Sequence, residues 1–131
     1  MVKSFRDLEV WRLGLDLAEM IYRCTSEFPK AETYGLTAQM RSAAVSIPSN
    51  IAEGQARTSS KEFLHFLSYS LGSLAELQTQ LDLATRLGYA DGQLAVAMAQ
   101  SELLGKKLHR LQNSIRDRAL LTSHQPLTTN P

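Results

Sequence analysis

The chain has 131 residues, of which 14 are basic and 13 are acidic, so its formal net charge is only +1. This length is enough for one domain with its own core and too short for two, and the charge excludes a strongly basic nucleic-acid-binding protein. No apolar run is long enough to cross a bilayer and the charged segment MVKSFRDLEVW does not resemble a signal peptide, so we expect a cytoplasmic protein with no membrane partner.

Glycine and proline divide the chain into four helical segments, and no alternating apolar run bounded by turn residues predicts a strand. The first helix is predicted over residues 5–27, because Phe28 precedes a proline and such a position disfavours helix. The second helix is predicted to begin between residues 32 and 36 and to end between residues 54 and 57.

The third helix has a readable beginning and end. Ser59 and Glu62 have the spacing of a capping box, in which a serine and a glutamate satisfy backbone N–H groups at a helix start. Gly88 follows Leu87 and predicts the end of the helix, because glycine adopts the left-handed conformation that commonly terminates helices.

Asp91 is a suitable capping residue for a fourth helix, which we expect to reach about Ala119. The sequence therefore predicts a four-helix bundle over residues 1–120 and a flexible C-terminal tail over residues 121–131. Four helices with short connections indicate an all-α, antiparallel, up-down-up-down bundle.

Apolar residues recur at helical spacing and give each of the last three helices one core-facing stripe. The stripes are Leu36, Met40, Ala43, Ala44, Ile47, Ile51 and Gly54; then Phe63, Leu64, Leu67, Leu71, Leu74 and Leu81; then Leu94, Ala97, Leu104, Leu108, Leu111 and Ile115.

The first helix instead carries two apolar stripes, and a helix in a small bundle needs only one. One stripe contains Leu8, Trp11, Leu15, Ala18 and Tyr22, and the other runs from Val10 to Phe28. We infer a homo-oligomer, although a wide core that buries both stripes is the alternative. The candidate interface residues, which include small residues of the second helix, are Val10, Leu13, Leu17, Ile21, Cys24, Ala38, Val45 and Ala52. Cys24 is the single cysteine of the sequence, so it cannot form a disulfide within the chain. We interpret it as a small buried hydrophobic side chain, with a reactive thiol as the alternative.

A polar stripe accompanies the core stripe of the second helix, which also contains a proline. We interpret it as a structural motif whose side chains hydrogen-bond to a neighbouring helix or to the carbonyl that the proline leaves without a donor. A polar site exposed to a ligand is the alternative. The motif comprises Gln39, Arg41, Ser46, Pro48, Asn50, Glu53 and Gly54.

Basic residues gather on the fourth helix, between Lys106 and Arg118. One interpretation is a solvated face whose cations are stabilised near the C-terminal, negatively polarised end of the helix. The other interpretation is phosphate binding. No aromatic residues interleave with these cations, so any nucleic-acid binding is expected to be electrostatic and weakly sequence-selective. The candidate nucleic-acid-binding residues are Lys106, Lys107, Arg110 and Arg116.

The sequence offers little for catalysis. The pair Glu62 and His65 matches one element of the di-iron carboxylate bundles, but the second pair and the additional glutamates of such a site are missing. No nucleophile elbow or phosphate loop occurs either. We therefore expect no enzyme, no metal and no cofactor, with Glu62 as a capping residue and His65 on the surface.

Several segments together resemble the four-helix-bundle proteins encoded in 23S rRNA intervening sequences, the S23 family. They are Phe5-x-Asp7-Leu8-x-Val10-Trp11, Phe28-Pro29-x-x-Glu32-x-x-Gly35-Leu36-Thr37, Gln39-x-Arg41, Ser46-Ile47-Pro48-x-Asn50-Ile51-Ala52-Glu53-Gly54 and Gly72-Ser73-x-x-Glu76-Leu77. The resemblance covers about residues 4 to 118. It implies an antiparallel bundle that assembles as a homopentamer. The family is also similar to the basic, nucleic-acid-binding accessory variability proteins of diversity-generating retroelements, whereas this chain is near neutral and has Ser42 where relatives often have a second basic residue.

These observations lead to one hypothesis and one alternative. The hypothesis is a non-enzymatic, pentameric interaction protein that binds RNA, DNA or a ribonucleoprotein electrostatically. The alternative is a purely structural scaffold or adaptor that binds a protein partner through its outer surface.

Overall fold

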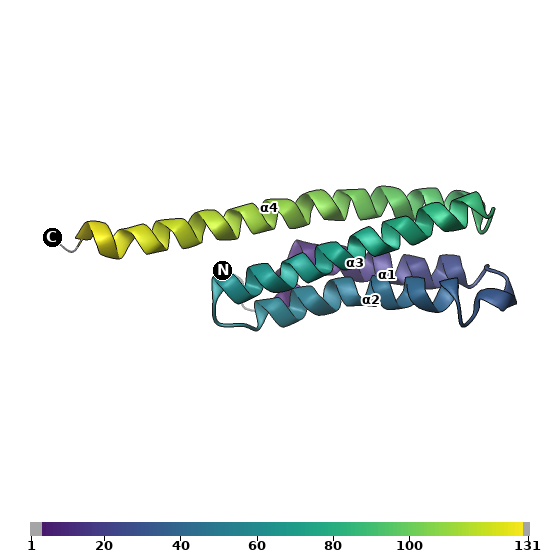
Figure 1. Cartoon of the computed structure of the whole chain (residues 1–131), viewed down its shortest axis with the longest axis horizontal. Helices are drawn as coiled ribbons and strands as arrows, with labels where there is room; N and C mark the ends of the chain where they lie inside the picture. Colours follow the sequence, from purple (N-terminus) through teal and green to yellow (C-terminus); the bar gives the residue numbers. More distant parts are fainter. Residues whose placement is uncertain (1–3, 130–131) are drawn as a thin grey trace.

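The computed structural model describes residues 4–129, and in that range the chain forms four α-helices, two short 3-10 helices and no strand (Figure 1). This confirms the all-α four-helix bundle. The elements are η1 (Phe5–Asp7), α1 (Glu9–Thr25), η2 (Lys30–Glu32), α2 (Leu36–Gln55), α3 (Ser60–Arg86) and α4 (Asp91–Thr129). None of these helices, over the described range, is long and apolar enough to cross a membrane.

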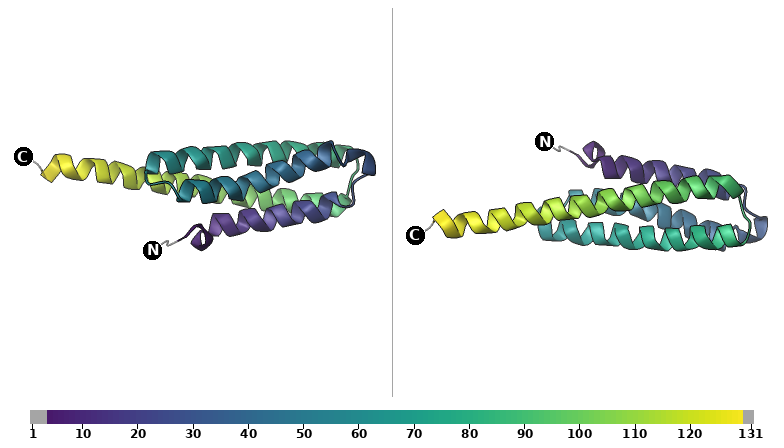
Figure 2. Two further views of the ribbon diagram at one scale, coloured as in Figure 1. Left: turned by 90° about the horizontal axis from the view of Figure 1, so that it is seen from below. Right: turned by 90° about the horizontal axis from the view of Figure 1, so that it is seen from above.

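Successive helices run in opposite directions. The α1–α2 and α3–α4 connections lie at one end of the bundle, and the α2–α3 connection lies at the other end, where the chain begins (Figure 1). Each helix packs against its neighbours in the chain, and α4 closes the bundle by packing against α1. The C-terminal part of α4 extends past the ends of the other three helices, as both views of Figure 2 show.

The first helical segment is interrupted, in contrast to the single helix expected over residues 5–27. Ser4 and Asp7 form a capping box at the start of the 3-10 turn η1. Leu8 then adopts an extended conformation before α1 begins at Glu9. The helix ends at Thr25, shortly before Phe28 and the proline that follows it.

The boundaries of α3 follow the predicted signals. The Ser59 hydroxyl oxygen accepts a hydrogen bond from the Glu62 backbone N–H at 3.1 Å, which confirms Ser59 as the N-cap. The other half of the predicted capping box is not formed, because the Glu62 carboxylate accepts from the Ser59 hydroxyl and not from the Ser59 backbone N–H. At the other end Gly88 has a φ of 75°, and the N–H groups of Gly88 and Tyr89 donate to the carbonyls of Thr85 and Ala84. This is the two-bond pattern of a Schellman motif.

The fourth helix begins at Asp91 as expected, but it continues to Thr129 rather than ending near Ala119. The segment from Ala119 to Gln125 contains neither glycine nor proline, so it holds no local signal that would stop a helix. The division at residue 120 and the flexibility of the tail remain predictions, and residues 130–131 lie outside the described range.

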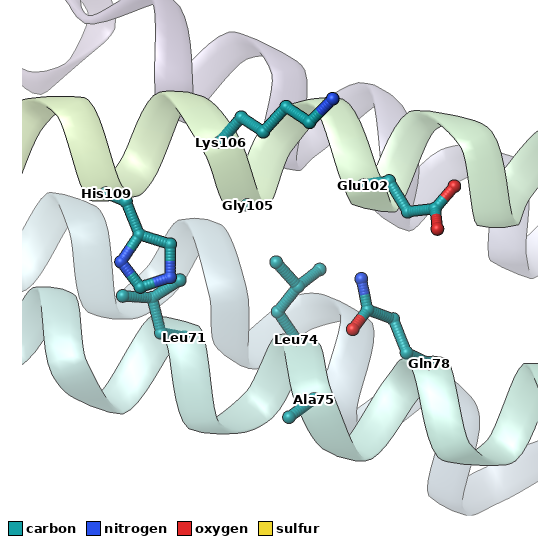
Figure 3. A pocket seen from close by; sticks show the side chains of 8 residues that line it. All are labelled: Leu71, Leu74, Ala75, Gln78, Glu102, Gly105, Lys106 and His109. Atoms are coloured by element: carbon teal, nitrogen blue, oxygen red, sulfur yellow. The ribbon is translucent and has the colours of Figure 1, made fainter.

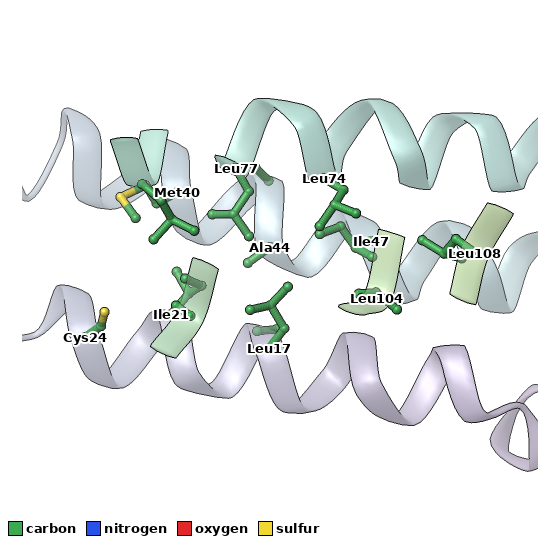
Figure 4. Packing of buried hydrophobic residues seen from close by; sticks show 14 of the residues in the cluster. Leu17, Ile21, Cys24, Met40, Ala44, Ile47, Leu74, Leu77, Leu104 and Leu108 are labelled. Carbon is green, nitrogen blue, oxygen red and sulfur yellow. The ribbon is translucent and has the colours of Figure 1, made fainter. Parts of the chain in front are cut away.

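The core is a continuous cluster of leucine, isoleucine, methionine and alanine side chains from all four helices (Figure 4). Each fully buried leucine or isoleucine contributes about 1.5–3 kcal/mol relative to an exposed one. The predicted core stripes of α2, α3 and α4 all contribute to this cluster. Ile21 of α1, Ile47 of α2, Leu77 of α3 and Leu108 of α4 have no exposed surface.

The orientation of α1 corrects the predicted oligomer interface. Val10, Leu17, Ile21 and Cys24 are buried in the core of their own chain, and Leu13 is half-buried against it, so they cannot serve as an open surface. The other stripe is divided: Ala18 is buried and Leu8 and Trp11 are half-buried against the core, whereas Leu15 is 48% exposed and Tyr22 is 44% exposed.

Close contact between α1 and α2 sets this orientation. A Cβ built on Gly14 would lie 3.4 Å from the Pro48 side chain, so the two helices meet where α1 has no side chain. With Gly14 turned toward α2, the stripe that contains Leu17 points into the core. The burial of Cys24 confirms it as a small hydrophobic side chain, and burial raises the pKa of its thiol.

The three interface candidates on α2 have a different environment. Val45 is 42% exposed, Ala38 is exposed and Ala52 is half-buried. Leu15 and Tyr22 of the neighbouring helix α1 are exposed apolar residues as well, and Arg41 of α2 lies over the Tyr22 ring. Self-association through these residues remains a prediction.

Candidate nucleic-acid interface

Three of the four predicted cationic residues lie exposed along α4. Lys106 and Arg110 are one helical turn apart, and Arg116 follows nearer the C-terminus. At 1.5 Å per residue, the array from Lys106 to Arg116 is about 15 Å long. The Arg116 guanidinium donates a hydrogen bond to the Asn113 side-chain oxygen at 3.3 Å, which steadies it without neutralising its charge.

Lys107, the fourth candidate, is separated from this array. Its ammonium group donates to a carboxylate oxygen of Glu9 at 3.1 Å, and its side chain is only 27% exposed. This ion pair joins α4 to α1 and directs the charge of Lys107 toward its own chain. Lys107 therefore belongs to the packing of the bundle more than to the exposed array.

A shallow groove of about 500 Å³ lies beside the array, between α3 and α4 (Figure 3). It stays open because small residues line it, and Gly105 approaches Leu74 without a side chain of its own. Its remaining lining residues are Leu71, Ala75 and Gln78 from α3, and Glu102, Lys106 and His109 from α4. Figure 3 shows the His109 ring beside Leu71, while the Lys106 side chain extends along α4 toward Glu102.

Gly72 of α3 has no close neighbour. A Cβ at Gly72 would meet no atom within 4 Å. The residue is exposed on α3, so a helical glycine at this position leaves open space instead of allowing a close helix approach.

Ser46 of the polar stripe joins α2 to α3, whereas Asn50 bonds within α2. Ser46 shares a hydrogen bond of 2.8 Å with Ser73 of α3, and Ser70 donates to the Ile47 carbonyl at 2.8 Å. The Asn50 side-chain amide donates to the carbonyl and to the hydroxyl of Ser46. Pro48 has no N–H, so the Ala44 carbonyl, four residues earlier, lacks its helical donor. The hydrogen bonds of the Asn50 amide go to Ser46 and not to this carbonyl.

Arg41 reaches from α2 to the C-terminal end of α1. Its guanidinium donates to the Thr25 hydroxyl at 2.8 Å and to the Tyr22 carbonyl at 3.1 Å, and it lies 4.5 Å from the centre of the Tyr22 ring. The Tyr22 carbonyl also accepts the Ser26 N–H at 3.2 Å, so Arg41 adds a bond from a second helix to the last turn of α1. Gln39 is exposed, as is Glu53, which forms a 3.5 Å ion pair with Arg57.

The end of the bundle opposite the α2–α3 connection contains a contact that sequence reasoning missed. The Tyr89 hydroxyl donates to a carboxylate oxygen of Glu32 at 3.0 Å, and the second oxygen of that carboxylate accepts from the Leu36 N–H at 3.2 Å. The hydrogen bond to Glu32 is the main reason that the pKa of Tyr89 is raised, with burial as a smaller cause. Only the tertiary structure brings residues so distant in sequence together.

Glu62 and His65, which match one element of a di-iron site, lie at the start of α3. Over the described residues, no group of three or more histidine, cysteine, aspartate or glutamate side chains could hold a metal ion. Glu62 is engaged at the start of α3, where it also accepts a hydrogen bond from the Ser59 hydroxyl, and His65 is exposed on the same helix.

Comparison with known proteins gives one family. The model of the 23S rRNA-intervening sequence protein family matches residues 6–110, from η1 to the middle of α4. No curated protein matches the chain in sequence. The family match includes Lys106 and Arg110, whereas Arg116 and the extended part of α4 lie beyond it.

Proposed function

The chain belongs to the 23S rRNA-intervening sequence protein family, and from this premise we propose that it is a cytoplasmic, RNA-binding protein that associates with itself and has no enzymatic activity. The family name connects these proteins with RNA, and the exposed array of Lys106, Arg110 and Arg116 is the observation that carries the proposal. RNA or a ribonucleoprotein would bind there through its phosphates.

The charges of the array support phosphate binding. Within the described part of the chain, none of the three cations has a carboxylate at ion-pair distance, in contrast to Lys107. A cation with no acidic partner can exchange its counterions for phosphates, and the released ions make binding favourable at low salt. The near-neutral net charge predicts modest affinity for each single copy.

Self-association would compensate for that modest affinity. The apolar surface around Leu15, Tyr22 and Val45 supports an assembly, and the family resemblance points to a pentamer. Five copies would repeat the array around an axis, so that one RNA molecule meets several arrays at high effective concentration.

A binding assay over a range of salt concentrations tests the proposal. Fluorescence anisotropy is measured with a structured RNA and with single- and double-stranded DNA. The triple variant Lys106→Glu, Arg110→Glu, Arg116→Glu is compared with a matched variant, Arg23→Glu, Lys30→Glu, Arg86→Glu, which makes the same charge change at other exposed positions.

The array variant is expected to bind weakly, and its slope of log affinity against log salt falls by about 2 to 3 because three phosphate contacts are lost. The matched variant keeps most of that slope. Absence of binding at low salt would remove the proposal and favour a scaffold for a protein partner. Equal losses in both variants would mean that net charge, and not the array, controls binding.

A further inference from the structure

A cluster of aromatic rings lies near the start of α3, on residues that the array on α4 does not use. The His65 and Tyr69 rings meet edge to face, with centroids 5.2 Å apart and planes at 86°. Phe66 meets the same tyrosine at 5.6 Å and 87°. Tyr69 is half exposed and His65 is exposed, so much of this cluster is open to solvent.

Two cations border the rings. The Arg57 guanidinium, at the end of α2, lies 4.8 Å from the centre of the Phe66 ring. Lys61 is exposed on the first turn of α3, four residues before His65 and therefore on the same side of the helix. Sequence reasoning missed this combination, although the three rings are close together on α3, because Arg57 lies outside that helix, in the α2–α3 connection.

The fold accounts for only part of the cluster. Phe66 covers Gly54 of α2, so it has a packing role. Tyr69 is outside the buried core, yet two perpendicular ring contacts restrict its position. Neither contact stacks a ring in parallel on Tyr69, and half of the Tyr69 surface is exposed.

The acidic groups nearby are already engaged. Glu53 pairs with Arg57 at 3.5 Å, and Glu62 holds the Ser59 cap at the start of α3. Lys61 is exposed on this part of α3, and no ion pair with it is found among the described residues. A ligand that suits this surface has a flat aromatic face and a negative charge next to it.

We propose that Tyr69 and His65, with Lys61 and Arg57 beside them, form a stacking site for an unpaired base of single-stranded RNA. This inference rests on the proposed function and adds the kind of RNA. Proteins that bind single strands combine aromatic platforms with cations along the backbone, as this surface does. Bases within a duplex are covered by their neighbours and cannot stack on Tyr69, so the site selects unpaired nucleotides.

The test uses the full chain and two RNAs, a single strand of about 12 nucleotides with 2-aminopurine at its centre, and a fully paired duplex of the same length. Tyr69→Ala is expected to weaken binding of the single strand by about fivefold or more. Quenching of the 2-aminopurine fluorescence is lost in that variant, and duplex binding stays within about twofold of the original. Tyr69→Phe keeps the ring and therefore keeps both signals.

Tyr34→Ala is the matched control, since Tyr34 is 96% exposed and lies between η2 and α2, at the other end of the bundle. Unchanged single-strand binding by Tyr69→Ala would overturn the stacking site, as would equal losses for both RNAs or failure of Tyr69→Phe to bind. Duplex binding that still depends on Lys106, Arg110 and Arg116 would then leave the proposed function standing. Absence of binding to either RNA by the unmodified protein would remove both proposals.

Discussion

Gly54 of α2 and Phe66 of α3 approach so closely that a Cβ built on the glycine would lie 2.7 Å from the phenylalanine Cβ. Phe63 adds a second obstacle, with a ring carbon 2.9 Å from the same position. The crossing of these two helices therefore requires glycine, because the Phe66 Cβ is fixed to the backbone and cannot rotate away.

Gly54→Ala is expected to lower the free energy of unfolding by about 1–3 kcal/mol, because overpacking forces the helices apart. Gly72→Ala is the matched control, since its new Cβ meets open space. That variant should stabilise the protein by about 0.5–1 kcal/mol through the better helix propensity of alanine. Urea unfolding measures both, and equal effects at the two positions would contradict the packing explanation.

Arg41→Lys should lower the free energy of unfolding by about 1–2 kcal/mol. A lysine keeps the charge but cannot donate to both Tyr22 and Thr25 with a planar fork, so contacts between α2 and α1 are lost. Arg23→Lys is the control, because the ion pair of Arg23 with Glu19 is exposed and worth about 0.5 kcal/mol or less. A loss at Arg41 no larger than that at Arg23 would remove the structural role of Arg41.

Tyr89→Phe should change how stability depends on alkaline pH. The pKa of Tyr89 is raised in the folded protein by its hydrogen bond to Glu32, so its contribution is present below the unfolded value of about 10 and is lost as pH rises through the folded value. The phenylalanine variant lacks this decline. Urea midpoints from neutral to alkaline pH measure the difference, with the 96% exposed Tyr34, as Tyr34→Phe, for comparison. Identical pH profiles for Tyr89→Phe and the unmodified protein would contradict the role of this hydrogen bond.

Val45→Glu is expected to dissociate the proposed assembly into monomers, because it places a charge in the apolar surface shared by α1 and α2. Light scattering at micromolar concentration measures the mass. Leu83→Glu, at a similarly exposed position on α3, should leave the assembly intact. A monomeric unmodified protein would end the self-association hypothesis, and dissociation by Leu83→Glu alone would move the interface to α3.

The helices could be predicted because their signals are local. The Ser59 and Glu62 pair marks the beginning of α3 and Gly88 marks its end, and the structure uses both. The end of α4 was harder to predict, because the sequence just after Ala119 lacks a stop signal and polar composition alone does not end a helix. The cations on α4 were visible as a cluster, but the pairing of Lys107 with Glu9 depends on a distant helix.

The sequence by itself determined four helical segments, both ends of α3 and the side of α2, α3 and α4 that faces the core, because periodicity and capping act within a single segment. Only the tertiary structure decided that Leu17 and Ile21 of α1 are fully buried whereas Leu15 and Tyr22 are exposed. That choice depends on the contact between Gly14 and Pro48, which lie on different helices. The ring cluster at Tyr69 lies on α3 alone, and only the contact of Arg57 with Phe66 depends on the conformation of the α2–α3 connection.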